Sequence, residues 1–152
     1  MANNSTKEKK EREIRHEVVE IRRVTRVTAG GKRLRFRSAV IVGDGKGGIG
    51  FGKGKANDVS QSVEKAVKKA EKEMMKIKLI EDRTIPFPVE GKYKSALVIL
   101  KPAKQGRGII AGGIVRKICR LAGIKDISAK SLGSGNKINK VKATLAALKN
   151  FV

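Results

Sequence analysis

A run of glycines and cations between two alternating segments constrains this chain most. Residues 30–56 read GGKRLRFRSAVIVGDGKGGIGFGKGKA. Apolar and polar positions alternate on both sides of GDGKGG, which predicts two strands joined by a turn whose glycines tolerate positive φ. Lysine or arginine occupies almost every polar position of this hairpin. Such a surface is suited to binding phosphates.

The net charge points to a polyanion as the partner. The 152 residues include 36 lysines and arginines against 14 aspartates and glutamates, a formal net charge of +22. Residues 1–80 and residues 81–152 each carry +11, so both halves are expected to face the polyanion. Nucleic acid is the first candidate and an anionic membrane the second.

The remaining composition argues against membranes, metals and secretion. No stretch approaches the roughly 20 apolar residues of a spanning helix, and the N-terminus lacks the apolar part of a signal peptide. Cys119 is the only cysteine and His16 the only histidine, so there is neither an internal disulfide nor a zinc-ligand set. We therefore expect a cytoplasmic protein with no cofactor and no membrane partner.

The first half predicts a β-β-β-α domain over residues 17–80. Residues 1–16 are densely charged and predict a flexible arm. Strands are expected over residues 18–27, with a bulge where the alternation slips, over residues 34–42, and in a short segment at Ile49 and Phe51. A helix capped by Asn57 or Asp58 follows, and its apolar stripe extends the helix to near Leu79.

The second half predicts an α/β two-layer domain over residues 81–152, so the fold class is α+β. Residues 81–87 read as a linker, and residues 95–101 as a buried strand. A helix follows the glycines at 112 and 113 and stops at Gly123. Residues 125–132 predict a strand, and the turn over 133–136 caps a last amphipathic helix.

Three enzyme motifs are approximated in the glycine cluster, and each fails. Gly45, Gly47 and Gly50 fit G-x-G-x-x-G, but the motif opens a strand instead of the helix that a dinucleotide fold requires. Residues 47–53 resemble a Walker A loop, yet Gly54 stands where a hydroxyl should bind magnesium. The kinase motifs that should accompany a glycine loop are missing. We predict that the protein is not an enzyme.

Two interpretations of these glycines stay open. They either make a tight hairpin and little else, or let backbone N–H groups approach phosphates while Lys46, Lys53 and Lys55 supply charge. The glycines at 106, 108, 112 and 113 similarly either expose a helix N-terminus to an anion or allow close helix packing.

A second basic group favours RNA recognised through its backbone. Seven cations with no intervening acid would repel one another on a free sheet, and phosphates would relieve that repulsion: Arg22, Arg23, Arg26, Lys32, Arg33, Arg35 and Arg37. The few aromatic residues include Phe36 and Phe51, which the alternation directs toward a core. Modules that stack unpaired bases need more exposed rings. Cys119 is expected in the core and His16 on the surface.

Three ordered blocks resemble the bacterial-type S-five family of small-subunit ribosomal proteins. They read RRVTRVTAGGKRLRF, then VGDGKGGIGFGKGKA, then KPAKQGRGIIAGGIVRKICRLAGIKDISAKSLGSGNKIN. The resemblance implies an N-terminal domain similar to the double-stranded-RNA-binding fold and a C-terminal α/β domain with a left-handed β-α-β crossover. It also implies a structural role in subunit assembly, decoding accuracy and messenger unwinding.

The resemblance implies partners and further site residues. The partners are small-subunit ribosomal RNA, the S-four and S-eight proteins, and messenger RNA near the entrance channel. Residues 25–33 match a loop that reaches ribosomal RNA, which adds Thr25, Thr28, Gly30 and Gly31 to the RNA-binding set. Arg107, Gly108 and Arg116 match the region facing S-four. The expected location is the ribosome, in the cytoplasm or, for a plastid-encoded chain, the stroma.

The sequence departs from the family pattern twice. Lys137 stands where a proline usually follows the asparagine, and the common C-terminal extension does not follow Val152. Two other function classes stay open. A free double-stranded-RNA-binding regulator would share the β-β-β-α unit but leaves the second basic domain unexplained. A basic phosphotransferase would require ATP turnover that depends on Lys53.

Overall fold

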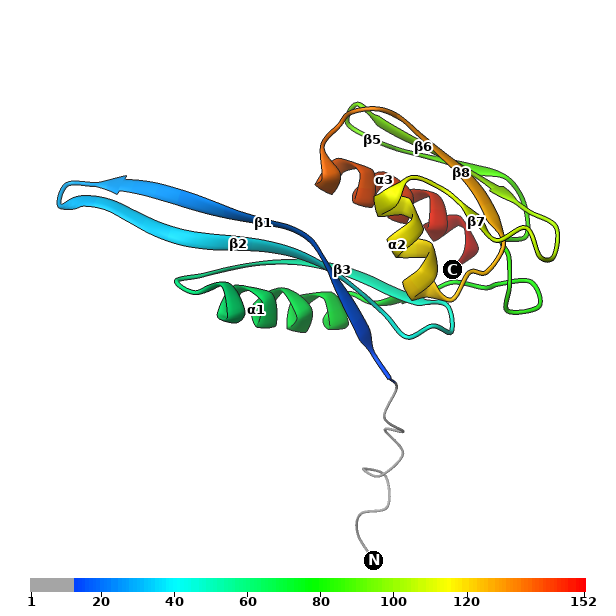
Figure 1. Cartoon of the computed structure of the whole chain (residues 1–152), viewed down its shortest axis with the longest axis horizontal. Helices are drawn as coiled ribbons and strands as arrows, with labels where there is room; N and C mark the ends of the chain where they lie inside the picture. Colours follow the sequence, from blue (N-terminus) through cyan, green and yellow to red (C-terminus); the bar gives the residue numbers. More distant parts are fainter. Residues whose placement is uncertain (1–12) are drawn as a thin grey trace, which may run out of the picture.

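The structure, a computed structural model, describes residues 13–152 and contains two four-stranded sheets. The first has the strand order β1-β2-β3-β4, and the second has the order β5-β6-β8-β7 (Figure 1). One helix covers the first sheet, and two helices lie between the second sheet and the first. The predicted α+β class and the β-β-β-α order are confirmed. Of the predicted arm, residues 1–12 lie outside the described residues.

The first sheet begins with long antiparallel strands. β1 (Arg15–Thr28) pairs with β2 (Gly31–Gly43) along its whole length, and β2 pairs with β3 (Gly48–Ala56) only from Phe36 onward. The distal part of β1 and β2 is therefore a two-stranded ribbon that extends beyond the sheet (Figure 1). β1 takes up the last two residues of the segment predicted as an arm, Arg15 and His16.

A β-bulge interrupts β1 near its start. The register shifts between Val18 and Glu20, so Val19 is the extra residue. Val18 packs with the residues under the helix, whereas Val19 is buried in the other core. The sequence predicted a bulge in the strand over residues 18–27, and the structure has one near the start of that segment.

The helix of the first unit is shorter than predicted. α1 (Val59–Lys72) follows Asp58, whose side chain makes no capping hydrogen bond, and ends at Glu73. The expected continuation to Leu79 is wrong, since β4 (Met75–Lys76) pairs with the start of β3. Ile77, which fits the helical stripe, instead packs in the core shared with the second unit.

The second unit is built around a crossover. β5 (Val89–Tyr93) and β6 (Ala96–Pro102) form a hairpin, and β6 pairs with β8 (Ile127–Gly133). β7 (Ile109–Ile110) runs parallel to β8 with α2 (Gly113–Ala122) between them, which is a β-α-β unit. α3 (Lys137–Leu148) and a 3-10 turn (Lys149–Phe151) end the chain. No helix within residues 13–152 is long and apolar enough to cross a membrane.

One apolar core joins the two units. Ala39, Ile41 and Ile49 from the first sheet pack in the same cluster as Val115 and Ile118 of α2 and the inner face of the second sheet. A smaller cluster holds α1 on the other face of the first sheet through Val40, Val42, Ala66 and Ala70. The first sheet is therefore covered on both faces, and its distal ribbon is not.

Candidate nucleic-acid interface

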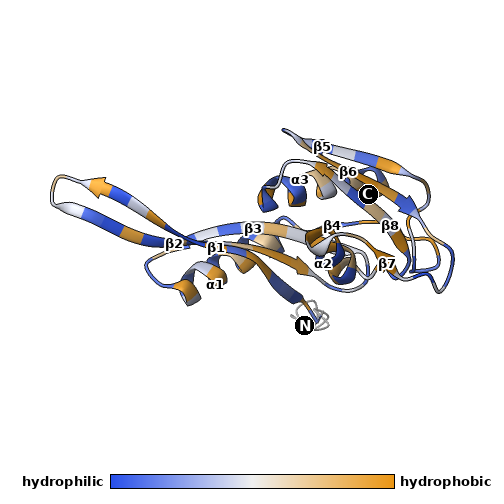
Figure 2. Ribbon diagram, turned by 45° about the horizontal axis from the view of Figure 1, so that its top comes forward, coloured by the Kyte–Doolittle hydropathy of each residue, from blue (hydrophilic) through white to orange (hydrophobic). Residues whose placement is uncertain are grey.

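The distal ribbon of β1 and β2 has two chemically different faces. Side chains of a strand alternate between faces, and directly paired residues of neighbouring strands share one. The pairs Arg22–Arg37, Val24–Arg35 and Arg26–Arg33 alternate with Arg23–Phe36, Thr25–Leu34 and Val27–Lys32. Figure 2 shows the resulting alternation of hydrophilic and hydrophobic residues along both strands.

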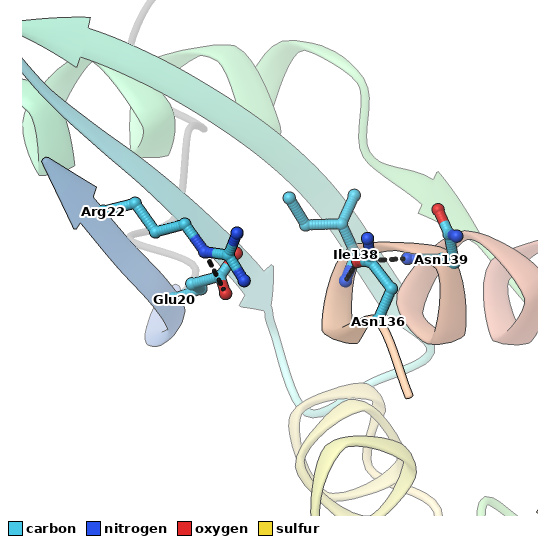
Figure 3. Close-up of polar contacts among 5 residues, drawn as sticks. All are labelled: Glu20, Arg22, Asn136, Ile138 and Asn139. Atoms are coloured by element: carbon cyan, nitrogen blue, oxygen red, sulfur yellow. Dashed lines mark hydrogen bonds and ion pairs between the residues drawn. The ribbon is translucent and has the colours of Figure 1, made fainter. Parts of the chain in front are cut away.

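The first of these faces, here called the arginine face, carries five arginines. It lies on the side of the first sheet that faces the second unit, because Arg37 shares it with Ala39 and Ile41. Its only ion pair among the described residues joins Arg22 Nε to Glu20 Oε1 at 2.7 Å (Figure 3). The members are Arg22, Arg26, Arg33, Arg35 and Arg37.

The opposite face, here called the apolar face, carries fewer cations. Ile21, Val27 and Leu34 are exposed there, Val27 to 76% of its surface, and Phe36 is half-buried. Only Arg23 and Lys32 contribute charge. The seven cations of the sequence group are thus not one surface: five lie together, and two lie on the far side.

β3 extends the arginine face with lysines. Lys55 is paired with Arg37, and Lys53 with Ala39, so both point to the same side as the arginines. The pKa of Lys53 is lowered, first by partial burial and then by the positive charges of Lys142, Arg37 and Lys69. The structure therefore brings Lys53 and Lys55 together with the five arginines.

Backbone N–H groups of the glycine turn are all engaged inside the protein. Gly45 and Gly47 donate to the carbonyls of Leu121 and Ala122 at 2.9 and 2.8 Å. Lys46 and Gly48 donate to Asp44 Oδ1, each at 2.8 Å, and Asp44 donates to the Gly48 carbonyl. The turn thus caps the last carbonyls of α2 instead of presenting a cradle for phosphate. The exposed Lys46 side chain stays a prediction as an RNA contact.

The glycines of β3 serve helix packing. A Cβ on Gly50, Gly52 or Gly54 would lie 2.3 or 2.4 Å from carbonyl oxygens of α1. Glycine at alternate positions therefore lets the α1 backbone lie directly on the strand. Neither interpretation drawn from the sequence included this role. Glycine at every second position of β3 indicates close helix packing only when it is known that a helix lies on that face of the strand.

The residues predicted to face S-four lie at the other end of the molecule. Arg107 and Arg116 are exposed, near the loop before β7 and the start of α2 (Figure 1). Gly108 has φ +75°, and its N–H donates to Asp126 Oδ1 at 2.9 Å. A Cβ on any of the glycines at 106, 108, 112 and 113 would meet nothing within 4 Å, so packing within the described chain does not require them.

Three further expectations are tested by burial. Cys119 is fully buried, and burial raises the pKa of its thiol to about 12, so the predicted core position is confirmed. His16 is exposed in β1, as predicted. Phe36 and Phe51 are only half-buried, Phe51 at the edge of the shared core.

Sequence reasoning missed the contribution of α3. Lys142 lies on this helix close enough to lower the pKa of Lys53, although 89 residues separate them in the chain. Asn136 caps the start of α3 by accepting hydrogen bonds from the N–H groups of Ile138 and Asn139 (Figure 3), and α3 also contacts β1. Only the tertiary fold brings these elements together.

Comparison with known proteins agrees with this architecture. Residues 14–78 match the family described as "Ribosomal protein S5, N-terminal domain", and residues 91–151 match "Ribosomal protein S5, C-terminal domain". The small ribosomal subunit protein uS5 of Gloeobacter violaceus is 49% identical over 138 residues. The match covers 91% of this chain and 62% of that relative, so the chain spans less than two thirds of the relative's length.

Proposed function

Because the chain belongs to the ribosomal protein S5 family, we propose that it is a structural, non-catalytic constituent of the small ribosomal subunit. It binds small-subunit ribosomal RNA through the arginine face and the lysines of β3. The observation that carries the proposal is the concentration of five arginines on one face of β1 and β2, with Arg26, Arg33 and Arg35 on the ribbon that extends beyond β3.

Electrostatics explains why such a face needs RNA. Arginines on directly paired strand positions lie about 5 Å apart at the Cβ atoms and repel one another. Glu20 neutralises the charge of only one of these arginines, Arg22. RNA phosphates neutralise the remaining charge and release counterions, which makes the affinity strongly dependent on salt. The β1–β2 ribbon is held in place by the covered part of the same sheet, so its charges are positioned before RNA binds.

Sedimentation of a tagged protein tests the proposal. A lysate of cells that express the tagged full chain is centrifuged through a high-salt gradient, and the tag is measured in each fraction. Stoichiometric retention on the small subunit is expected. A tag confined to free fractions, or bound equally to any duplex RNA of the same length, would contradict the proposal and favour a free RNA-binding regulator.

We also propose finer contacts, which rest on the family resemblance. Arg107, Gly108 and Arg116 face S-four, the protein also touches S-eight and messenger RNA near the entrance channel, and these contacts support assembly and decoding accuracy. Both arginines are exposed, and the Gly108 N–H is held by the buried Asp126. A photo-reactive group at position 107 is expected to cross-link to S-four within intact subunits. Capture of a different ribosomal protein would contradict this assignment.

A further inference from the structure

Cations from both units converge where α3 meets the first sheet. Arg37 of β2 and Lys53 of β3 share the face of the first sheet that is turned toward the second unit. Lys142 of α3 lines a groove with Phe51, which lies two residues before Lys53 on the same face of β3. The positive charges of Lys142 and Arg37 also lower the pKa of Lys53, after the effect of its partial burial. We call Arg37, Lys53 and Lys142 the junction cluster. Lys53 is exposed, whereas Arg37 and Lys142 are half-buried.

The junction cluster has no counter-anion in the described part of the chain. The ion pairs there use Arg15, Arg22, Arg83 and Lys117, and none includes a member of the cluster. Glu73 lines the adjoining groove between β3 and α3, but it forms no ion pair with these cations. Three neighbouring cations held together by the fold favour an anion between them.

Tyr93 holds Lys142 in position. The Lys142 Nζ donates a hydrogen bond to Tyr93 Oη at 3.2 Å and lies 4.8 Å from the centre of the ring. This hydrogen bond and the lysine charge lower the pKa of Tyr93. A lysine ammonium normally moves on a flexible stem, so a hydrogen bond and a cation–π contact together reduce the entropy lost when it binds a ligand.

The junction cluster continues the arginine face. Arg37 belongs to both, and Lys55 lies beside it on β3. Residues on one face of a strand repeat about every 6.6 Å, and neighbouring strands lie about 4.8 Å apart. These spacings give a row of cations that a nucleic-acid backbone, with one charge per nucleotide, can follow from the β1–β2 ribbon to α3.

We propose that the junction cluster is a phosphate-binding site by which the RNA bound to the arginine face also contacts the second unit, with Tyr93 as the residue that positions Lys142. This inference rests on the proposed function and deepens it. It adds Lys142 to the RNA-binding residues and makes the bound RNA bridge the two units of the fold.

Lys142→Gln in the full chain tests the site. Binding to protein-free small-subunit ribosomal RNA, and to an unrelated RNA duplex of equal charge, is measured between 50 and 200 mM salt. The slope of log affinity against log salt is negative, and the variant should make it shallower by about 0.7 to 0.9. The wild-type advantage over the variant should therefore shrink about threefold across this range.

Lys130→Gln is the matched control. Lys130 is exposed on β8, on the face of the second sheet turned away from α3, and its loss changes the net charge equally. It should leave the slope nearly unchanged. Tyr93→Phe retains the ring but removes the hydrogen-bond acceptor, so it should produce a smaller loss than Lys142→Gln. Thermal unfolding of each variant checks that the fold is intact.

The outcomes separate the two proposals. If folded Lys142→Gln has the wild-type slope on both RNAs, or the same slope as Lys130→Gln, the junction cluster does not bind phosphate. If the wild-type protein prefers neither RNA, the ribosomal assignment is contradicted, and the difference between the two lysine variants still decides the cluster. If an acidic peptide competes with the RNA only when Lys142 is present, the ligand is a protein and the inference is overturned.

Discussion

At the residue scale, Cys119 illustrates a position that the sequence predicted correctly. It follows Ile118 on α2, beside the apolar stripe, and its side chain is fully buried. The pattern sufficed because a single cysteine without histidine or cysteine partners has few roles other than packing. Lys142 is the opposite case: its neighbours Tyr93 and Lys53 come from other elements, so no local pattern could identify it.

The burial of Cys119 predicts slow reaction with thiol reagents. Burial raises the pKa of this thiol to about 12, so the reactive thiolate is scarce at pH 8. Alkylation by iodoacetamide, followed by mass spectrometry, should be negligible in the native protein and complete in urea. Rapid modification of the native protein would contradict the assigned core position.

At the element scale, prediction from the sequence fails where a segment fits both a helical and a strand pattern. Met74 and Ile77 continue the helical spacing of α1, yet β4 begins at Met75 because strand pairing with β3 and burial of Ile77 in the shared core prevail. The glycines of β3 were ambiguous for a similar reason. Their role depends on which element crosses the strand, and this information is not local.

Gly52→Ala tests the packing of α1 on β3. The new Cβ would lie 2.3 Å from the Ala66 carbonyl oxygen and 2.6 Å from the Ala70 nitrogen, so the helix must shift. Urea unfolding should show that the free energy of unfolding falls by about 2 kcal/mol. Gly30→Ala is the control, because its Cβ meets nothing within 4 Å, and it should change stability by less than about 0.5 kcal/mol. If Gly52→Ala and Gly30→Ala changed the stability equally, the α1 backbone would not lie as close to β3 as described.

At the scale of the whole molecule, the two predicted domains share one core and one capping interaction. The sequence predicts a boundary near residue 80; the first matched family covers residues 14–78 and the second covers residues 91–151. Turn residues 45 and 47 nevertheless cap α2, and Gly43 packs against Leu121. Contacts of this kind join segments nearly 80 residues apart, so composition and periodicity could not reveal them.

Gly43→Ala should therefore destabilise both units. Its Cβ would lie 2.3 Å from the Leu121 carbonyl oxygen, which would separate the turn from α2. Tyr93, the only tyrosine, lies in the second unit and reports on its unfolding by fluorescence. We expect the urea midpoints measured by Tyr93 fluorescence and by circular dichroism to fall together, with a loss of about 2 kcal/mol in the free energy of unfolding. An unchanged Tyr93 midpoint would mean that the units unfold independently.

The central claim is that RNA binds the arginine face, and two double variants of the same ribbon test it most directly. R26Q/R33Q removes two charges from the arginine face, whereas R23Q/K32Q removes two charges from the apolar face at neighbouring positions. Binding to small-subunit ribosomal RNA is measured as a function of salt. The first pair should make the negative slope of log affinity against log salt shallower by about 1.8, and the second pair should change it much less. Equal losses, or a larger loss for R23Q/K32Q, would contradict the account.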